Sequence, residues 1–377
     1  RFKRAGSAAI RTSVVPGYRR FLEFMERHYV PAARATIGAS ELPRGREYYR
    51  FVIRKFTTLD LTAEEVHQTG MSEVRRIRAE MLDVIRKTGF DGDFAAFVDF
   101  LRTDPRFYAP SAEQLQKEVA FILKRMDGEL PRMFKKLPRT PYGIREVPSY
   151  IAPRSTAAYY QMPAGDGSRA GFYFINTYDL KSRPLYALEA LSFHEAVPGH
   201  HLQLALQQEL ADLPNFRRFS GFTSYIEGWA LYAERLGLEL GFYTDPYSDF
   251  GRLTYEMWRA CRLVVDTGIH DLGWSREQAI EGDPPVRPIG VDPHETGRRR
   301  RVEPGLHVAC ELDRLVRARL ARHREAIVVA VEALVEASAA IQRGAGDEGG
   351  RGVARGGEHL RDRLVLVGEK ALPVVPY

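Results

Sequence analysis

One segment dominates the interpretation of this chain: His194-Glu195-Ala196-Val197-Pro198-Gly199-His200-His201, which ends an apolar, helix-like run. Neutral imidazole is a preferred ligand of Zn²⁺, and a glutamate beside the first ligand can take a proton from water that the ion has acidified. Three histidines and one such glutamate occur together here. The segment therefore predicts the site of a zinc hydrolase that holds one ion, with Glu195 as its proton acceptor.

The spacing of these histidines differs from the usual zincin pattern, in which two ligands stand four residues apart on one helical face. His200 follows His194 by six residues and His201 follows it by seven. On an unbroken helix His201 would return to the face of His194, but about 10 Å along the axis, too far to share an ion. Pro198 and Gly199 allow the helix to bulge or kink. This favours His200 as the second ligand, with His201 as its rival.

A zinc site of this type needs a third protein ligand and leaves one position open. Glu227 is the best candidate, because it lies in a segment with helical periodicity between Ile226 and Trp229. A carboxylate in apolar surroundings is normally bound to a metal or paired with a cation. The alternative to a ligand role is therefore that Glu227 is the buried partner of an arginine. Glu234 lies seven residues further on the same face. It either fixes a ligand imidazole or is a surface charge.

A helix predicted from about Asp249 carries a further polar cluster: Arg259, Arg262, Asp266 and His270. Peptide hydrolysis builds negative charge on the carbonyl oxygen, which a histidine or arginine near the metal stabilises. We expect His270 to do this, with Arg262 as an alternative that instead holds a substrate carboxylate. An arginine–aspartate ion pair beside a loop histidine is the competing interpretation.

Residues 171–177 are rich in β-formers and follow a turn-like segment, 164–168. Peptidases often align an extended substrate along an exposed strand edge. We therefore expect Tyr173 and Asn176 to contact substrate there, while an ordinary strand with half of its residues in the core remains the alternative.

Helical patterns occupy most of the remaining chain. Helices are expected from Tyr18 to Arg34, from a capping box at Thr62–Glu65 to about Lys87, and from Ser111 to Met126. An apolar helix from Leu185 to Val197 carries His194 and Glu195 into the interior.

Three motifs of the chain resemble a bacterial family known as domain of unknown function 885. They are SFHEAVPGHHLQ at 192–203, YIEGWALYAERLG at 225–237 and RLVVDTGIHDLGWSREQA at 262–279. The resemblance covers most of residues 18–280. It implies a mainly α, zincin-like metallopeptidase fold similar to thimet oligopeptidase, angiotensin-converting enzyme and the thermostable carboxypeptidases. In those relatives a Gly-His follows the His-Glu, which matches Gly199-His200 with the ligand position. A small antiparallel β element is expected before the active-site helix.

Composition limits the other function classes. The 377 residues contain no apolar run long enough for a membrane span. The net charge of +6 comes with many acidic residues, so no nucleic-acid partner is expected. Cys261 and Cys310 are too few for a disulfide scaffold and indicate no compartment. The first residue is Arg1, which predicts that the start, and any signal peptide, lies upstream. No feature indicates an oligomeric state.

The composition changes abruptly near the C-terminus. From Glu281 onward there is one aromatic residue, Tyr377, and one lysine, Lys370, alongside Arg-rich and Gly-rich runs. The likeness to the family stops after Ala279. We therefore divide the chain into a helical metallopeptidase-like domain, residues 1–280, and an atypical tail, residues 281–377, that is frame-shifted, replaced or disordered. An RNA-binding arm is disfavoured, because no aromatic stacking residues accompany the charge.

The sequence thus predicts a zinc-dependent hydrolase of peptide bonds. His194, His200 and Glu227 hold the ion, Glu195 activates water and passes its proton to the leaving amine, and His270 or Arg262 stabilises the oxyanion. The alternatives are a metal-binding or structural helical protein that has lost catalysis with its altered tail, and a hydrolase of non-peptide amides.

Overall fold

The computed structural model describes residues 2–281, which divide into two compact units, residues 2–35 and residues 36–281. The first unit contains α1 (Phe2–Ala9) and α2 (Val15–Phe24), each followed by a π-helical turn, Ile10–Val14 and Met25–Tyr29. The helix expected from Tyr18 to Arg34 therefore starts earlier and ends earlier. The proposed boundary near residue 280 coincides with the end of the described residues, and the tail lies outside them.

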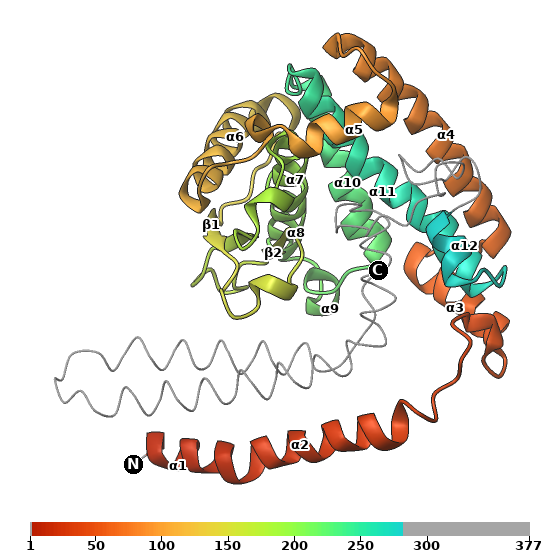
Figure 1. The fold of residues 1–377 in the computed structure, drawn as a ribbon. Coiled ribbons are helices and arrows are strands. Elements are labelled where there is room, and N and C mark those ends of the chain that lie inside the picture. Colours follow the sequence, from red (N-terminus) through yellow and green to blue (C-terminus); the bar gives the residue numbers. More distant parts are fainter. Residues whose placement is uncertain (1, 282–377) are drawn as a thin grey trace. The chain divides into compact units, whose positions relative to one another are not determined.

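The second unit is mainly helical, as predicted (Figure 1). Its α-helices are α3 (Gly45–Thr57), α4 (Ala63–Thr88), α5 (Phe94–Thr103), α6 (Ala112–Met133), α7 (Leu188–Glu195), α8 (His200–Gln208), α9 (Asn215–Arg218), α10 (Thr223–Glu239), α11 (Pro246–His270) and α12 (Arg276–Glu281). Short 3₁₀ turns occupy Ala39–Glu41, Pro105–Phe107, Ala152–Arg154, Leu180–Ser182 and Leu185–Ala187.

Local sequence sets the starts of the long helices. The capping box is confirmed, because the Thr62 hydroxyl accepts the Glu65 amide and the Glu65 carboxylate accepts the Thr62 amide. Ser111 caps α6 in the same manner through the Gln114 amide. Both caps satisfy amides that the first helical turn leaves unpaired.

Two helices distant in sequence, α4 and α11, pack side by side along their length (Figure 1). Ile77 of α4 and Leu253 and Val264 of α11 are completely buried in one core cluster. Arg76 links the helices by an ion pair to Glu256. This packing fixes the helix that carries the predicted polar cluster.

A second core cluster holds the segment with the three histidines. Fully buried Phe193 of α7 packs there with apolar side chains of α6, including Leu115 and Met126, and with Tyr173. α7 in turn packs on α10 and α11. The site helices are therefore held from several sides.

A three-stranded sheet precedes α7, with strands β1 (Tyr142–Glu146), β2 (Ala158–Gln161) and β3 (Gly171–Ile175). The spatial order is β1-β3-β2, with β1 parallel and β2 antiparallel to β3. The expected β element is present, but the sheet is mixed rather than purely antiparallel. Its central strand is β3.

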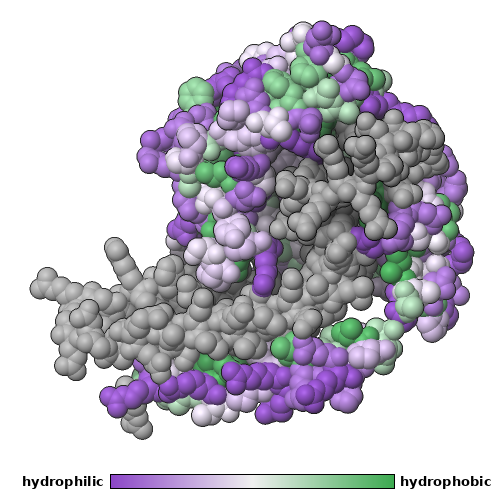
Figure 2. Space-filling model, viewed as in Figure 1, coloured by the Kyte–Doolittle hydropathy of each residue, from purple (hydrophilic) through white to green (hydrophobic). Residues whose placement is uncertain are grey.

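On the face shown in Figure 2, most of the described residues are hydrophilic, and the apolar ones form separate areas. Across residues 2–281, every helix is too short or too polar to cross a bilayer.

Replacement of Leu253 by alanine tests the α4–α11 core. Leu253 is completely buried, whereas Leu263 on the same helix is 36% exposed. We expect Leu253→Ala to lower the free energy of unfolding by about 3 kcal/mol through lost burial and a residual cavity, and Leu263→Ala to lower it by less than about 1 kcal/mol. Urea unfolding followed by circular dichroism measures both; equal losses would contradict this packing.

Candidate metal centre

The chain breaks its helix between the histidines, rather than bulging or kinking within a continuous helix. α7 ends at Glu195 and α8 begins at His200, so four residues, 196–199, separate the two helices. Ala196 and Gly199 adopt non-helical backbone angles, φ −112° and ψ −100° for Ala196 and φ −77° and ψ −127° for Gly199. A Cβ added at Gly199 would stand 2.0 Å from the His194 carbonyl oxygen. Glycine is therefore needed where the two helices meet most closely.

Residues of α10 and α8 brace this break. The Trp229 indole donates a hydrogen bond to the Pro198 carbonyl at 2.8 Å, and the Gln203 amide donates one to the Tyr225 carbonyl at 2.9 Å. Both bonds tie the α7–α8 junction to α10, so Glu227 has a defined position opposite the histidines.

The break and its bracing bring together His194, His200 and Glu227. One donor atom from each lies within 4.8 Å of the others. His194 Nε2 is 3.4 Å from one Glu227 oxygen, and His200 Nε2 is 3.7 Å from the other. Both histidines are buried, while the Glu227 side chain is 47% exposed, so the group faces an open side.

This donor set fits zinc. Two imidazoles and one carboxylate form a common catalytic zinc set that keeps a fourth position free. Ligand atoms about 2.0–2.1 Å from a tetrahedral ion stand roughly 3.4 Å apart. The two histidine–glutamate separations, 3.4 and 3.7 Å, are close to that value.

Behind the ligands lies a carboxylate that the sequence left undecided between two roles. Glu234 is buried, and its Oε1 accepts a hydrogen bond from His194 Nδ1 at 2.8 Å. This bond leaves Nε2 of His194 directed at Glu227. Glu234 therefore orients the imidazole of His194, a candidate ligand, and is not a surface charge.

The arginine that reaches this group is Arg259. Its Nη2 lies 3.1 Å from His194 Nδ1, and its Nη1 lies 3.4 Å from Glu234. Arg259 belongs to the polar cluster that the sequence singled out, but it was not the residue chosen from it. Arg259 precedes Arg262 by three residues and so lies near it on one face of the helix. This spacing was the sequence signal that could have identified it.

The electrostatics of the group reflect burial and paired carboxylates. Burial alone lowers the pKa of His194, but hydrogen bonds to Glu227 and Glu234 outweigh it and raise that pKa to about 9. Burial opposes ionisation of Glu227, but the contact with His194 lowers its pKa to about 2. Burial, reinforced by His194, lowers the pKa of His200 to about 4. Burial raises the pKa of Glu195 to about 7.

His201, the rival ligand, points elsewhere. Its Nδ1 is 2.8 Å from the Tyr160 hydroxyl, and its ring packs on Tyr142 of β1. Burial lowers its pKa to about 4. His201 therefore joins α8 to the sheet, and the structure groups His200 with His194.

The structure does not bring His270 to this group. His270 ends α11, eleven residues beyond Arg259, which corresponds to about 16 Å along the helix axis. Its Nδ1 accepts the Ala39 amide at 3.2 Å, and its ring packs on Tyr49. The structure therefore places His270 away from the metal group, where its side chain holds the 3₁₀ turn before α3.

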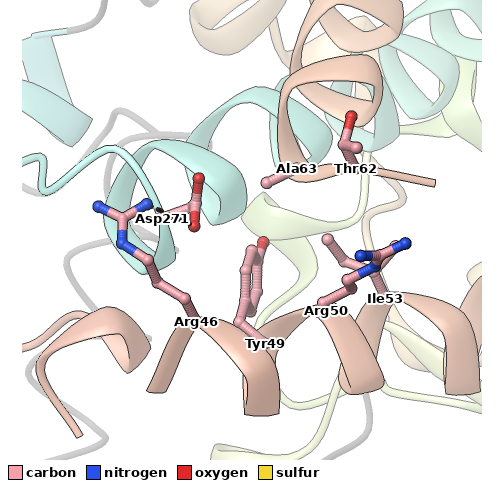
Figure 3. A pocket seen from close by; sticks show the side chains of 7 residues that line it. All are labelled: Arg46, Tyr49, Arg50, Ile53, Thr62, Ala63 and Asp271. Atoms are coloured by element: carbon pink, nitrogen blue, oxygen red, sulfur yellow. Dashed lines mark hydrogen bonds and ion pairs between the residues drawn. The ribbon is translucent and has the colours of Figure 1, made fainter. Parts of the chain in front are cut away.

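Figure 3 shows the surroundings of that end of α11. Asp271, which follows His270, lines a cavity of about 190 Å³ together with Arg46, Tyr49 and Arg50 of α3. Arg46 Nη1 lies 3.2 Å from Asp271. Arg262, the alternative residue, places its guanidinium carbon 4.8 Å from the Trp258 ring centre.

The two residues expected to contact substrate are structural. β3 is the middle strand, so it has no exposed edge, and this expectation is wrong. Tyr173 is completely buried in the core. Asn176 is also completely buried, and its side-chain amide donates to the carbonyls of Ala152, Ser155 and Thr156. These bonds fasten the loop between β1 and β2.

Comparisons with known proteins agree with this fold. A sequence model described as "Bacterial protein of unknown function (DUF885)" matches residues 1–282. The chain is similar to a solved structure described as the "putative lipoprotein from Colwellia psychrerythraea", with 30% sequence identity and a TM-score of 0.72. That alignment covers 89% of this chain and 61% of the other, so this chain spans about three fifths of its length. No curated protein matches the chain.

Matched glutamine substitutions distinguish the two neighbouring histidines. We expect His200→Gln to weaken zinc binding by more than about a hundredfold, because it removes a ligand, and His201→Gln to change it by less than about tenfold. Competition with a chromophoric chelator gives both affinities, and circular dichroism shows whether each variant is folded. A larger loss for His201→Gln would show that His201, and not His200, is the second ligand.

The raised pKa of His194 predicts a pH dependence of metal binding. Zinc must displace the proton that His194 holds below its pKa of about 9, while His200 and Glu227, with pKa values of about 4 and 2, are already deprotonated. Between pH 7 and pH 9 we expect the affinity to rise, by at most about tenfold per pH unit and by less as the pH approaches 9, because one proton is released. Chelator competition across this range measures it. A pH-independent affinity would contradict the predicted protonation of His194.

Proposed function

The chain belongs to the bacterial family DUF885, and we propose that this member is a zinc-dependent hydrolase of peptide bonds. The observation that carries the proposal is the convergence of His194, His200 and Glu227 directly beside the buried carboxylate of Glu195. Metal ligands alone are common in structural sites. A buried carboxylate that follows the first ligand in sequence, beside a three-ligand set that can leave a fourth position for water, is what hydrolysis requires.

Zinc bound by these three residues would polarise a carbonyl group and lower the pKa of water to about 7. Glu195 follows His194 on the last turn of α7 and is buried. Its pKa of about 7, raised by burial, suits a group that must both accept and return a proton near neutral pH. Glu195 therefore takes the proton of the attacking water and delivers it to the leaving amine.

Arg259 takes the role first expected of His270 or Arg262. Its guanidinium is held between His194 and Glu234, and its side chain is 21% exposed. A fixed cation at this position favours the negative charge that develops on the carbonyl oxygen during the reaction. Glu234 shares Arg259 and His194, so it keeps both groups oriented.

Two other functions are outcomes of the same experiments. Bound zinc without cleavage of a mixed peptide library favours a metal-binding protein that lacks catalysis. Cleavage of small amides but not of peptides favours a non-peptide amide hydrolase.

Substitution of Glu195 by glutamine tests the proposal. We expect Glu195→Gln to keep zinc and to lower kcat by about a hundredfold to ten-thousandfold, because glutamine cannot accept the proton. Zinc content by elemental analysis and cleavage of a fluorogenic peptide library are the measurements.

Glu189→Gln on the same helix is the matched control. Glu189 is a partly buried glutamate of the same helix, but its carboxylate accepts the Tyr243 amide and pairs with Arg125. This variant should keep its activity. A fully active Glu195→Gln protein would exclude Glu195 as the proton acceptor.

A further inference from the structure

A cavity of about 200 Å³ opens between α10 and α11, next to the metal centre. α10 contributes Gly228, Leu231, Tyr232 and Arg235 to its lining, and α11 contributes Arg252 and Glu256. Leu231 and the ring of Tyr232, which is half exposed, give this cavity an apolar wall. Four charged side chains complete the lining: Glu234, Arg235, Arg252 and Glu256.

The cavity is an extension of the proposed metal centre. Gly228 directly follows Glu227 in α10, and Leu231 lies one turn further along the helix. A Cβ added at Gly228 would meet nothing within 4 Å, so the space beside the ligand carboxylate is open. Glu234, which binds His194 Nδ1, also lines the cavity.

Three of the four charged side chains that line the cavity already have ionic partners. Glu234 pairs with His194 and Arg259. Glu256 pairs with Arg76 and with Arg252, and Arg252 pairs further with Asp249 at 2.7 Å. The opposite charges in these pairs neutralise one another, and the pairs fix the side chains on the α11 wall.

Arg235 differs from the other three. It is exposed, and it has no ion pair with any residue in the described part of the chain. A guanidinium offers a planar set of donors that matches a carboxylate in a bidentate arrangement. Among the charges that line the cavity, Arg235 is the one available to a ligand.

We propose that this cavity is a substrate subsite that binds a carboxylate through Arg235, with Leu231 and Tyr232 holding the adjoining side chain. The proposal rests on the proposed function. Arg235 lies eight residues beyond Glu227, or about 12 Å along α10. An extended peptide advances about 3.3–3.6 Å per residue, so the carboxylate stands about three or four residues from the bond that is cleaved. It is either the free carboxyl terminus of a short peptide or an acidic side chain of a longer one.

Binding measured without turnover tests the subsite. Zinc-loaded Glu195→Gln protein is titrated with three peptides that differ only near the carboxyl end: one with a free carboxyl terminus, the same peptide amidated, and the amidated peptide with glutamate at the penultimate position. Isothermal titration calorimetry gives each affinity. A terminal-carboxylate site binds the first peptide best, and a site for acidic side chains binds the third as well as the first.

The same titrations are repeated with the double variant Glu195→Gln, Arg235→Gln. We expect the affinity for the carboxylate-bearing peptides to fall about tenfold to a hundredfold and the affinity for the amidated peptide to change by less than about twofold. Arg75→Gln removes the same charge from an exposed position of α4 that does not line the cavity, and should change none of the affinities. Gly228→Leu, which fills the cavity while favouring the helix, should weaken all three peptides.

The proposal is overturned if Arg235→Gln weakens the amidated and free peptides equally, if it weakens neither, or if no carboxylate-bearing peptide binds the parent protein. Cleavage by the zinc-loaded wild-type protein is measured separately on the same peptides. An affinity that depends on Arg235, without cleavage, would contradict the proposed hydrolase activity but not the proposed carboxylate-binding site.

Discussion

The interruption of the helix between Glu195 and His200 is the constraint on which the site depends. A continuous helix would carry His200 and His194 apart along one axis, and no choice of rotamers would let both meet a single ion. Ala196 and Gly199 take non-helical backbone angles, so α8 restarts in a new direction with His200 at its first position. The close approach of Gly199 to the His194 carbonyl permits no side chain there. The geometry of the candidate metal centre therefore depends first on the course of the backbone between Glu195 and His200.

The groups behind the ligands explain how so many ionisable side chains remain in a buried region. A buried carboxylate is costly unless it is paired, and Glu234 is paired with His194 and Arg259, although its Oε2 has no hydrogen-bond partner among the described residues. The pKa of His194 is raised for the same reason, because its proton neutralises the nearby carboxylates of Glu227 and Glu234. A divalent cation bound at this position would neutralise them instead. The arrangement favours exchange of that proton for a metal ion.

Sequence periodicity predicted the elements well and their mutual placement poorly. The capping box at Thr62 and the long apolar stripes located α4, α6 and α11, because those signals are local. The position of β3 between two other strands could not be predicted, because pairing with Tyr142–Glu146 and Ala158–Gln161 depends on contacts across the chain. The expectation for Asn176 failed for the same reason.

The candidate site shows the same division between local and distant information. His200 was favoured over His201 on helix geometry, but the partner that draws His201 away, Tyr160, lies 41 residues distant in sequence. On α11, the sequence predicted one helix that carries Arg259, Arg262 and His270 as parts of a polar cluster. It could not show which turn of that helix crosses α7, and this crossing selects Arg259.

The helix α10 connects these observations, because one of its faces serves both the ion and the space beside it. Glu227 and Glu234 stand seven residues apart, so they share a face and differ by about 10 Å along the axis. The first contacts both histidines from the open side, and the second contacts His194 from the buried side. Gly228 and Leu231 lie between them in sequence and line the cavity. Any shift of α10 along its axis would therefore alter metal geometry and cavity shape together, which couples the two through a single rigid element.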